Sequence, residues 1–259
     1  MGNKGRFVWY ELLAGDPEAA KAFYGTVVGW KAQPWDADAG AYSVLTAGET
    51  PVGGVMKLLP EFECLGKRPH WWAHVAVEDV DGGARRAEEL GGRILKPGTE
   101  IPKVGRFAIV ADPQGAIIAL FRGQGEEMPA PDLMRPGGVS WHELHTTDLE
   151  GAWRFYAGLF GWQPTETLDL GAMGPYRMFR NADDPANAAM GGMFNAAKVS
   201  SEPPHWLYYL HVEAMDGAVA RLRKEGGTVL QGPMDVPGGG RAAQCRDPQG
   251  ADFGLFSLK

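Results

Sequence analysis

The chain has 259 residues and a formal net charge of −7, from 25 Lys and Arg against 32 Asp and Glu, and 44% of its residues are hydrophobic. This is the composition of an ordinary folded protein, and an acidic chain without a cluster of Lys or Arg makes nucleic acid and membrane surfaces poor partners. No apolar run approaches the roughly 18–20 residues of a membrane span, and the first residues lead into a strand-like segment, so we expect a cytoplasmic protein.

The first quarter of the chain predicts a strand, a helix and two further strands. Residues 7–13 are strand-like, and Asp16-Pro17-Glu18 supplies the N-cap, the first-turn proline and the acid of a helix that should end at Gly29. Short strands are expected over 41–47 and 53–59.

The second quarter follows the same plan. A strand over 71–77 precedes a helix over about 80–90 that Gly91-Gly92 closes. Further strands are expected around 92–95, 106–111 and 116–122. Asp112-Pro113-Gln114-Gly115 is typical of a reverse turn, because it supplies an acceptor, a proline-fixed φ and a glycine.

The second half of the chain is a copy of the first. Trp9-Tyr10-Glu11-Leu12 returns 132 residues later as Trp141-His142-Glu143-Leu144, and the turn at 112–115 returns as Asp247-Pro248-Gln249-Gly250. A polar stretch rich in Pro and Gly separates the copies, so we predict a domain over 1–122, a linker over 123–137 and a second domain over 138–259. Each domain then holds two units of one strand, one helix and two or three strands.

The sequence resembles the vicinal oxygen chelate superfamily, which includes glyoxalase I, bleomycin and fosfomycin resistance proteins and extradiol dioxygenases. It is most similar to tandem-duplicated bacterial members of that superfamily. The motifs that carry the resemblance are Asp16…Phe23-Tyr24…Gly29-Trp30, its copy Asp148…Phe155-Tyr156…Gly161-Trp162, the segments 77–81 and 212–216, and the two Asp-Pro-Gln-Gly turns. The resemblance implies an α+β fold of four βαβββ modules that form two eight-stranded half-barrel cups. Four modules in one chain can pair internally, so a monomer or a homodimer is expected.

Polar and aromatic residues alternate on the strands that would line these cups. Strand alternation puts Trp9, Glu11 and Leu13 on one face, and a carboxylate there is costly to bury unless it is paired or hydrogen-bonded. We predict three catalytic candidates, which are Glu11, Glu143 and His145. We also predict nine ligand-binding candidates, which are Trp9, Tyr42, Trp72, His74, Trp141, Tyr176, Arg177, Tyr209 and His211. The structural alternative is that the carboxylates pair with Arg or with backbone amides and that the tryptophans belong to the core.

The metal ligands that the resemblance implies are missing from this sequence. The matching positions are Trp9, Trp72, Ala119, Trp141, Leu207 and Gly254, whose side chains offer no lone pair to a cation. The two cysteines, Cys64 and Cys245, are too few for a thiolate site. We therefore expect no cofactor. A displaced site for Zn, Ni or Fe stays as the alternative, built from members of the set Glu11, His74, Glu143, His145 and His211.

Two functional classes follow from these residues. The first is a binding protein of the bleomycin-resistance type that holds a drug or metabolite, a small organic molecule, in an aromatic-lined cup. The second is an enzyme, either a lyase or isomerase of the glyoxalase type or a dioxygenase, with Glu or His as base and a displaced divalent metal. Saturable ligand binding without turnover would distinguish the first from the second.

Overall fold

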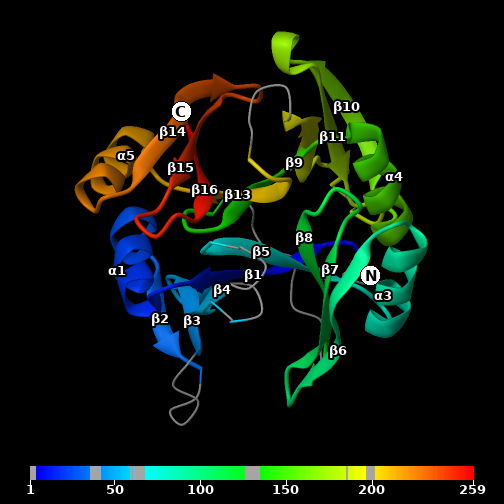
Figure 1. Cartoon of the computed structure of the whole chain (residues 1–259). Helices are drawn as coiled ribbons and strands as arrows, with labels where there is room; N and C mark the ends of the chain where they lie inside the picture. Colours follow the sequence, from blue (N-terminus) through cyan, green and yellow to red (C-terminus); the bar gives the residue numbers. More distant parts are fainter. Residues whose placement is uncertain are drawn as a thin grey trace. The chain divides into compact units, whose positions relative to one another are not determined.

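The protein is described from a computed structural model that covers residues 4–35, 42–58, 60, 68–125, 135–184, 186–196 and 202–259. Four modules of one strand, one helix and three strands follow one another along the chain (Figure 1). This confirms the α+β class and the four-module plan. Cys64 and most of the expected linker lie outside the described residues.

Each pair of consecutive modules contributes one mixed sheet of eight strands. In every module the first strand pairs with the last in parallel, and the remaining pairs are antiparallel. The first sheet has the order β2-β3-β4-β1-β5-β8-β7-β6, with β1 Phe7–Ala14, β2 Lys31–Pro34, β3 Tyr42–Ala47, β4 Thr50–Lys57, β5 His70–Ala76, β6 Arg93–Ile101, β7 Gly105–Ala111 and β8 Ile117–Gly123. The second sheet has the order β10-β11-β12-β9-β13-β16-β15-β14, with β9 Val139–Thr146, β10 Gln163–Asp169, β11 Pro175–Arg180, β12 Gly191–Asn195, β13 His205–His211, β14 Thr228–Val236, β15 Gly240–Arg246 and β16 Asp252–Leu258.

The helices begin and end largely where the sequence predicts. They are α1 Pro17–Val28, α3 Val80–Glu89, α4 Leu149–Phe160 and α5 Met215–Lys224. The Asp16 side chain accepts the backbone N–H groups of Glu18 and Ala19, and α1 ends at Gly29, whose φ of 89° lies in the left-handed region that suits glycine. Helix α5 differs, because its N-cap is Ala214 and has no side-chain hydrogen bond.

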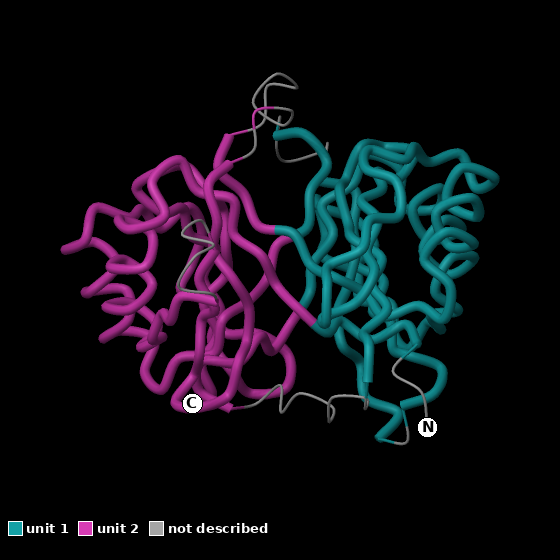
Figure 2. Tube along the Cα trace, turned by 90° about the horizontal axis from the view of Figure 1, so that it is seen from below, with its two compact units in different colours: residues 1–8, 72–130, 142–206 teal, residues 9–71, 131–141, 207–259 magenta. Residues whose placement is uncertain are grey.

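The chain forms two compact units, and each unit draws on both halves of the sequence (Figure 2). Unit 1 consists of Met1–Val8, Trp72–Ala130 and His142–Trp206, and unit 2 of Trp9–Trp71, Pro131–Trp141 and Leu207–Lys259. Helix α3 packs near α4 in unit 1, and α1 packs near α5 in unit 2. The domain boundaries expected from the repeat stay a prediction.

Within each unit a buried hydrogen-bond network joins residues of different modules. In unit 2, the Tyr24 hydroxyl donates to Asp247 Oδ2 over 3.2 Å and accepts Trp71 Nε1–H over 3.0 Å. Unit 1 repeats the arrangement, because Tyr156 donates to Asp112 Oδ2 over 3.0 Å and accepts Trp206 Nε1–H over 2.9 Å. The helical tyrosine of one module therefore holds the reverse turn of another module.

The reverse turn is also held from within. Asp112 Oδ1 accepts the backbone N–H groups of Gln114, Gly115 and Ala116 over 2.7–2.9 Å. Burial raises the pKa of the Asp112 carboxyl, while these N–H groups and Tyr156 act in the opposite direction. The Asp-Pro-Gln-Gly motif thus fixes both a turn and a contact between modules.

Two further observations bear on the expectations from sequence. Burial raises the pKa of the Cys245 thiol to about 12, so this side chain is an unreactive thiol near neutral pH. None of the helices in the described part of the chain is long and apolar enough to span a membrane.

Candidate functional site

In unit 1, a buried carboxylate is held by a phenol and an imidazole. Glu143 is 8% exposed and lies in the middle of β9. Its Oε2 accepts the Tyr176 hydroxyl over 3.0 Å, and its Oε1 lies 2.8 Å from His145 Nε2. We call Glu143, His145 and Tyr176 the second-half cluster. The structure therefore brings together two of the predicted catalytic residues and one predicted ligand-binding residue.

Strand alternation and one glycine build the second-half cluster. Glu143 and His145 are two residues apart on β9 and share a face. Strand β12 lies between β9 and β11, with Gly192 opposite Glu143, so Tyr176 must reach across β12 to its partner. A Cβ at Gly192 would overlap the Tyr176 ring. The second glycine of the Gly191-Gly192 pair thus leaves the room for this contact.

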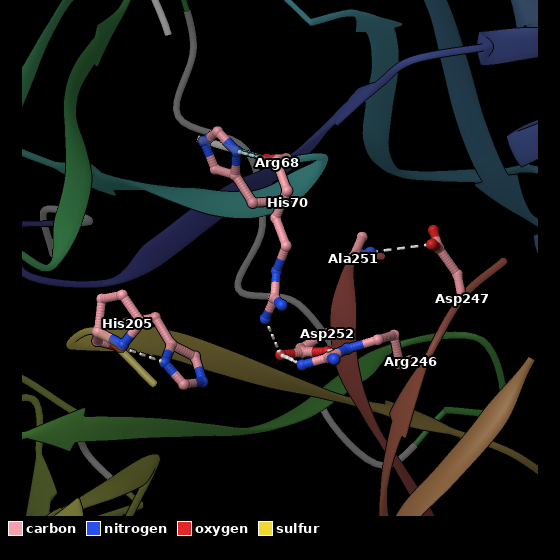
Figure 3. A network of polar contacts seen from close by, with 8 residues as sticks. Arg68, His70, His205, Arg246, Asp247, Ala251 and Asp252 are labelled. Atoms are coloured by element: carbon pink, nitrogen blue, oxygen red, sulfur yellow. Dashed lines mark hydrogen bonds and ion pairs between the residues drawn. The ribbon is translucent and has the colours of Figure 1, made fainter. Parts of the chain in front are cut away.

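The rings of Phe194 and His205 contact that of His145. The Phe194 ring lies edge-on at a centroid distance of 4.8 Å, and the His205 ring lies at 4.6 Å. His205 is oriented by the backbone, because its Nδ1 lies 2.8 Å from the carbonyl oxygen of Pro203 (Figure 3). The sequence patterns did not predict Phe194 as a neighbour of this site. It lies beside His145 in the sheet, as Met56 lies beside Leu13 in the first copy.

Unit 2 contains the matching first-half cluster, which is Glu11, Tyr42 and Trp9. Glu11 is 8% exposed, and Trp9 Nε1–H donates to the Tyr42 hydroxyl over 2.9 Å. Burial, followed by the negative charge of Glu11, raises the pKa of Tyr42. Tyr42 crosses β4 above Gly54, where a Cβ would overlap its hydroxyl. The geometry of the carboxylate and the phenol is therefore repeated.

The two clusters differ at one position. Leu13 of β1 stands where the copy has His145, and Leu13 is fully buried. An imidazole can exchange a proton near neutral pH and an alkyl side chain cannot. Only the second-half cluster combines a buried carboxylate with a group of this kind.

The remaining predicted residues fall into separate surroundings. Tyr209 packs in an apolar cluster of unit 2 with Leu207 and Ala242, next to the partly buried Trp141, and its hydroxyl accepts an N–H of Gln244 over 3.2 Å. His74 in unit 1 lies near the Phe107 and Phe121 rings, and His211 in unit 2 lies near the Phe256 ring. Trp72 is 2% exposed.

Arg177 is a predicted ligand-binding residue that lies away from the second-half cluster and contacts helix α4. Its guanidinium donates two hydrogen bonds to the Glu150 carboxylate of α4 and lies 5.5 Å from the Trp153 ring centroid. Because Arg177 follows Tyr176 on β11, the two side chains point to opposite faces of the sheet. Arg177 therefore lies on the helix side.

Comparison with known proteins places the chain in a family. The family model described as "Glyoxalase/Bleomycin resistance protein/Dioxygenase superfamily" matches residues 6–120 and again 138–255. The chain belongs to this superfamily.

Individual relatives carry different functional names. CFP32 of Mycobacterium bovis, named as a candidate glyoxylase, is 30% identical over 250 residues, which cover 96% of this chain and 93% of that protein. The anthracycline biosynthesis protein DauV of a Streptomyces species is 30% identical over 264 residues, which cover 97% of this chain and 92% of that protein. The names therefore include both a candidate glyoxylase and a protein of anthracycline biosynthesis.

Solved structures from the superfamily share the fold at low identity. The Mn(II)-bound glyoxalase of Novosphingobium aromaticivorans has a TM-score of 0.64 at 16% identity and covers 98% of this chain and 82% of that one. The 2,3-dioxygenase LapB of Pseudomonas sp. KL28 has a TM-score of 0.66 at 13% identity and covers 99% and 93%. Identities this low show the fold alone.

The residues of this chain do not fit the metal site that the glyoxalase superfamily implies. At the implied positions, Ala119 lies beside His74, and Gly254 lies under the Tyr209 ring, which occupies the space that a carboxylate side chain would need. In the described part of the chain, no group of three or more His, Cys, Asp or Glu side chains could hold a metal ion. We therefore derive no chemistry through a metal, and the expectation that the protein works without one stays a prediction.

Two polar features of unit 2 have structural explanations. Asp252 is ion-paired with both Arg68 and Arg246, which ties the start of β16 to the segment before β5 (Figure 3). A surface hollow of about 380 Å³ borders Arg221, whose guanidinium donates to the last carbonyl groups of α1 at Thr26 and Val27. The residues that line this hollow include none of the predicted site residues.

Proposed function

We propose that this protein binds a small planar organic molecule at its buried glutamate clusters. The observation that carries this proposal is the repeated pair of a buried glutamate and a strand-crossing tyrosine, Glu11 with Tyr42 and Glu143 with Tyr176. In each half a glycine makes room for the tyrosine, so the arrangement depends on residues from three adjacent strands. Buried polar groups placed among aromatic side chains are typical of small-molecule sites.

Flat aromatic side chains near the clusters favour a flat ligand. Trp9 belongs to the first-half cluster, and Phe194 borders the second-half cluster. Aromatic faces stack well on planar ligands. The relative named for anthracycline biosynthesis supports the same ligand class for this chain. The predicted residues Trp72, His74, Trp141, Tyr209 and His211 stay part of this proposal as further ligand contacts.

The alternative is an enzyme of the glyoxalase type that works without the superfamily's usual metal ligands. The 30% identity to a protein named as a candidate glyoxylase favours this alternative. Here Glu143 and His145 would act on the substrate directly as base and proton carrier. Turnover of an α-oxoaldehyde by metal-free protein would support this function, and binding without turnover would support the first.

A titration with 7-methoxycoumarin tests the binding proposal, because this probe is planar and has no hydroxyl group. Binding is read from quenching of tryptophan fluorescence. We expect saturable binding that weakens about three- to tenfold in Tyr176→Phe or Tyr42→Phe, since each change removes one hydrogen bond that orients a glutamate. The control is Glu88→Gln, which removes an exposed carboxylate from α3. Absence of saturable binding by this probe and by a panel of larger planar compounds would contradict the proposal.

A further inference from the structure

The two clusters are near-copies, but only the second-half cluster contains an imidazole, that of His145, beside its buried carboxylate. In the second-half cluster His145 uses Nε2 for its contact with Glu143, which leaves Nδ1 for a ligand. The side chain of His145 is 12% exposed. In the first-half cluster the same position is Leu13, which is fully buried.

The charges around His145 favour a ligand that gives up a proton. Glu143 Oε2 accepts the Tyr176 hydroxyl and Oε1 faces His145 Nε2, so the carboxylate is already oriented toward the imidazole. A proton arriving at Nδ1 would create an imidazolium paired with this carboxylate over 2.8 Å. Among the residues that the structure describes, His205 is a further ionisable side chain in ring contact with His145, and its Nδ1 faces the Pro203 carbonyl oxygen.

From this arrangement we propose that the second-half cluster recognises a planar ligand through a weakly acidic hydroxyl, phenolic or enolic, and takes its proton. The O–H bond of the ligand breaks, an N–H bond forms at His145 Nδ1, and the ligand stays bound as an anion beside the imidazolium. The Glu143 carboxylate balances the new positive charge, and the proton returns to the ligand on release. Tyr176 is a positioning residue, because it holds Glu143 and does not meet the ligand hydroxyl.

The first-half cluster cannot perform this step. Glu11 is held by Tyr42, and the side chain that follows it on the same face of β1 is an alkyl group. The first-half cluster can therefore anchor a ligand, but it has no imidazole through which a proton could be exchanged. The proposal rests on the proposed binding function and adds to it the ligand class and the half of the chain that handles the proton.

A matched pair of probes tests this proposal. 7-Hydroxycoumarin carries a weakly acidic hydroxyl whose ionisation changes its absorption spectrum, and 7-methoxycoumarin has the same ring system without that hydroxyl. At a pH where free 7-hydroxycoumarin is mostly neutral, we expect the wild-type protein to increase the anion absorption band in proportion to the bound fraction. The charge-assisted contact should also make 7-hydroxycoumarin bind about tenfold more tightly than 7-methoxycoumarin.

Variants separate the proton acceptor from the shape of the site. His145→Leu copies the first-half cluster, and His145→Gln keeps a hydrogen-bonding side chain that cannot accept the proton. Both should lose the anion band and the preference for the hydroxyl probe, while 7-methoxycoumarin binding changes less than about threefold. Tyr176→Phe should weaken the band without abolishing it. Glu88→Gln is the control, and thermal unfolding identifies any variant that fails to fold.

The outcomes distinguish the two proposals. Failure of both probes, and of larger planar compounds, would contradict the binding function itself. Binding of both probes with equal affinity and no anion band would leave the binding function standing and overturn the proton transfer. An anion band that persists in both His145 variants would also overturn it, because the acceptor would then be another group.

Discussion

At the scale of single residues, the two Gly-Gly pairs are the positions where the lack of a side chain leaves room for the two clusters. Gly54 and Gly192 lie under the rings of Tyr42 and Tyr176, and a Cβ at either would overlap the tyrosine. These two glycines therefore allow the tyrosine rings to pack directly against the backbone, which a residue with a side chain would prevent. A Cβ at Gly53 or Gly191 would likewise overlap a backbone carbonyl oxygen, that of Tyr10 or of His142.

Gly192→Ala should displace Tyr176 from Glu143 and weaken ligand binding. We expect a loss of about 1–3 kcal/mol in the free energy of unfolding, typical of overpacking a well-packed site, measured by urea denaturation. Gly217→Ala is the control, because the nearest atom to its new Cβ would be an Arg221 nitrogen at 3.4 Å and the residue lies inside α5. That variant should keep or gain stability. Equal effects of the two substitutions would contradict the close-approach explanation.

Tyr156→Phe should destabilise the protein through the network in unit 1. The change leaves Asp112 Oδ2 and Trp206 Nε1–H without the hydroxyl that joins them. Loss of a partner for buried polar groups costs about 1–3 kcal/mol, which chemical denaturation can measure. Tyr24→Phe should give a loss of similar size, since unit 2 repeats the network. A neutral result at both positions would show that these hydrogen bonds add nothing to stability.

The buried turn aspartates should make stability depend on pH in a defined direction. Burial raises the pKa of Asp112, so the folded protein holds this proton more tightly than the unfolded chain does. The resulting stabilisation is present below the ordinary pKa of the carboxyl and is lost as the pH rises through the folded value. Asp112→Asn removes this titration. As the pH rises above the ordinary pKa of an aspartate, the free energy of unfolding of this variant should therefore increase relative to that of the wild type.

A change in the opposite direction would mean that the N–H groups that bond Asp112 Oδ1 outweigh burial. Asp247 provides a second test, because burial also raises its pKa in unit 2. Both variants should therefore show the same sign of pH dependence. Chemical denaturation of each variant and the wild type at several pH values gives the comparison.

Residue patterns predicted the second-half cluster in part. Alternation along the strand correctly placed Glu143 and His145 on one face. The same alternation could have placed Arg177 and Tyr176 on opposite faces of the sheet, since neighbouring residues on a strand point in opposite directions. The sequence does not show, however, that Glu150 of α4 is the partner of Arg177 on its face. The contact of Asp112 with Tyr156 was beyond prediction, because spacing along the chain does not show which modules pack together.

At the scale of elements, the first residues of α3 and α5 show how one sequence difference removes a capping hydrogen bond and leaves the backbone of the helix start almost unchanged. Asp79 caps α3 and accepts the backbone N–H of Asp81, while α5 begins at Ala214 without a side-chain cap. The two N-cap residues have almost the same backbone angles, with φ of −139° and −143° and ψ of 112° and 118°. A capping side chain should therefore fit at position 214 without a change of backbone.

Ala214→Asp should stabilise the protein by about 1 kcal/mol, the usual worth of an N-cap side chain. The reason is that its carboxylate can accept one of the free N–H groups in the first turn of α5. Thermal unfolding should show a rise of a few degrees. Asp79→Ala is the reverse change and should lower stability by a similar amount. A fall in stability with Ala214→Asp would show that the two helix starts differ beyond their caps.

The edge strands β2 and β10 were not predicted from the sequence. Every residue of β2 is exposed, and β10 is exposed except for the partly buried Leu168. A strand without a buried face has no apolar alternation to reveal it. Strand β6 was expected around 92–95 but extends over Arg93–Ile101 with register shifts, because bulges break the regular pattern.

At the scale of the whole molecule, neither half of the sequence contains a complete compact unit. The buried face of α1 includes Phe23 and Tyr24, and its partners in unit 2 include residues from the second half of the chain, among them Asp247 and Phe253. The same holds for α4 in unit 1, whose Tyr156 bonds to Asp112. Cutting the chain between its two copies would expose both helices.

Residues 138–259 produced alone should therefore self-associate or lose stability. The apolar faces of α4 and α5 would lack α3 and α1, and burial of apolar surface is the main source of stability in small domains. Size-exclusion chromatography and thermal unfolding measure the two outcomes, and mixing with residues 1–122 should restore the unfolding temperature of the full chain. A monomeric half as stable as the full chain would contradict this prediction.

The difference between Leu13 and His145 has a genetic consequence. In a symmetric dimer of identical chains, one codon specifies the same residue in both sites, so a mutation that improves one site alters the other as well. Two linked copies are released from that constraint. One site can acquire an imidazole while its twin keeps a leucine, and each can then be selected for a separate task within a single gene product.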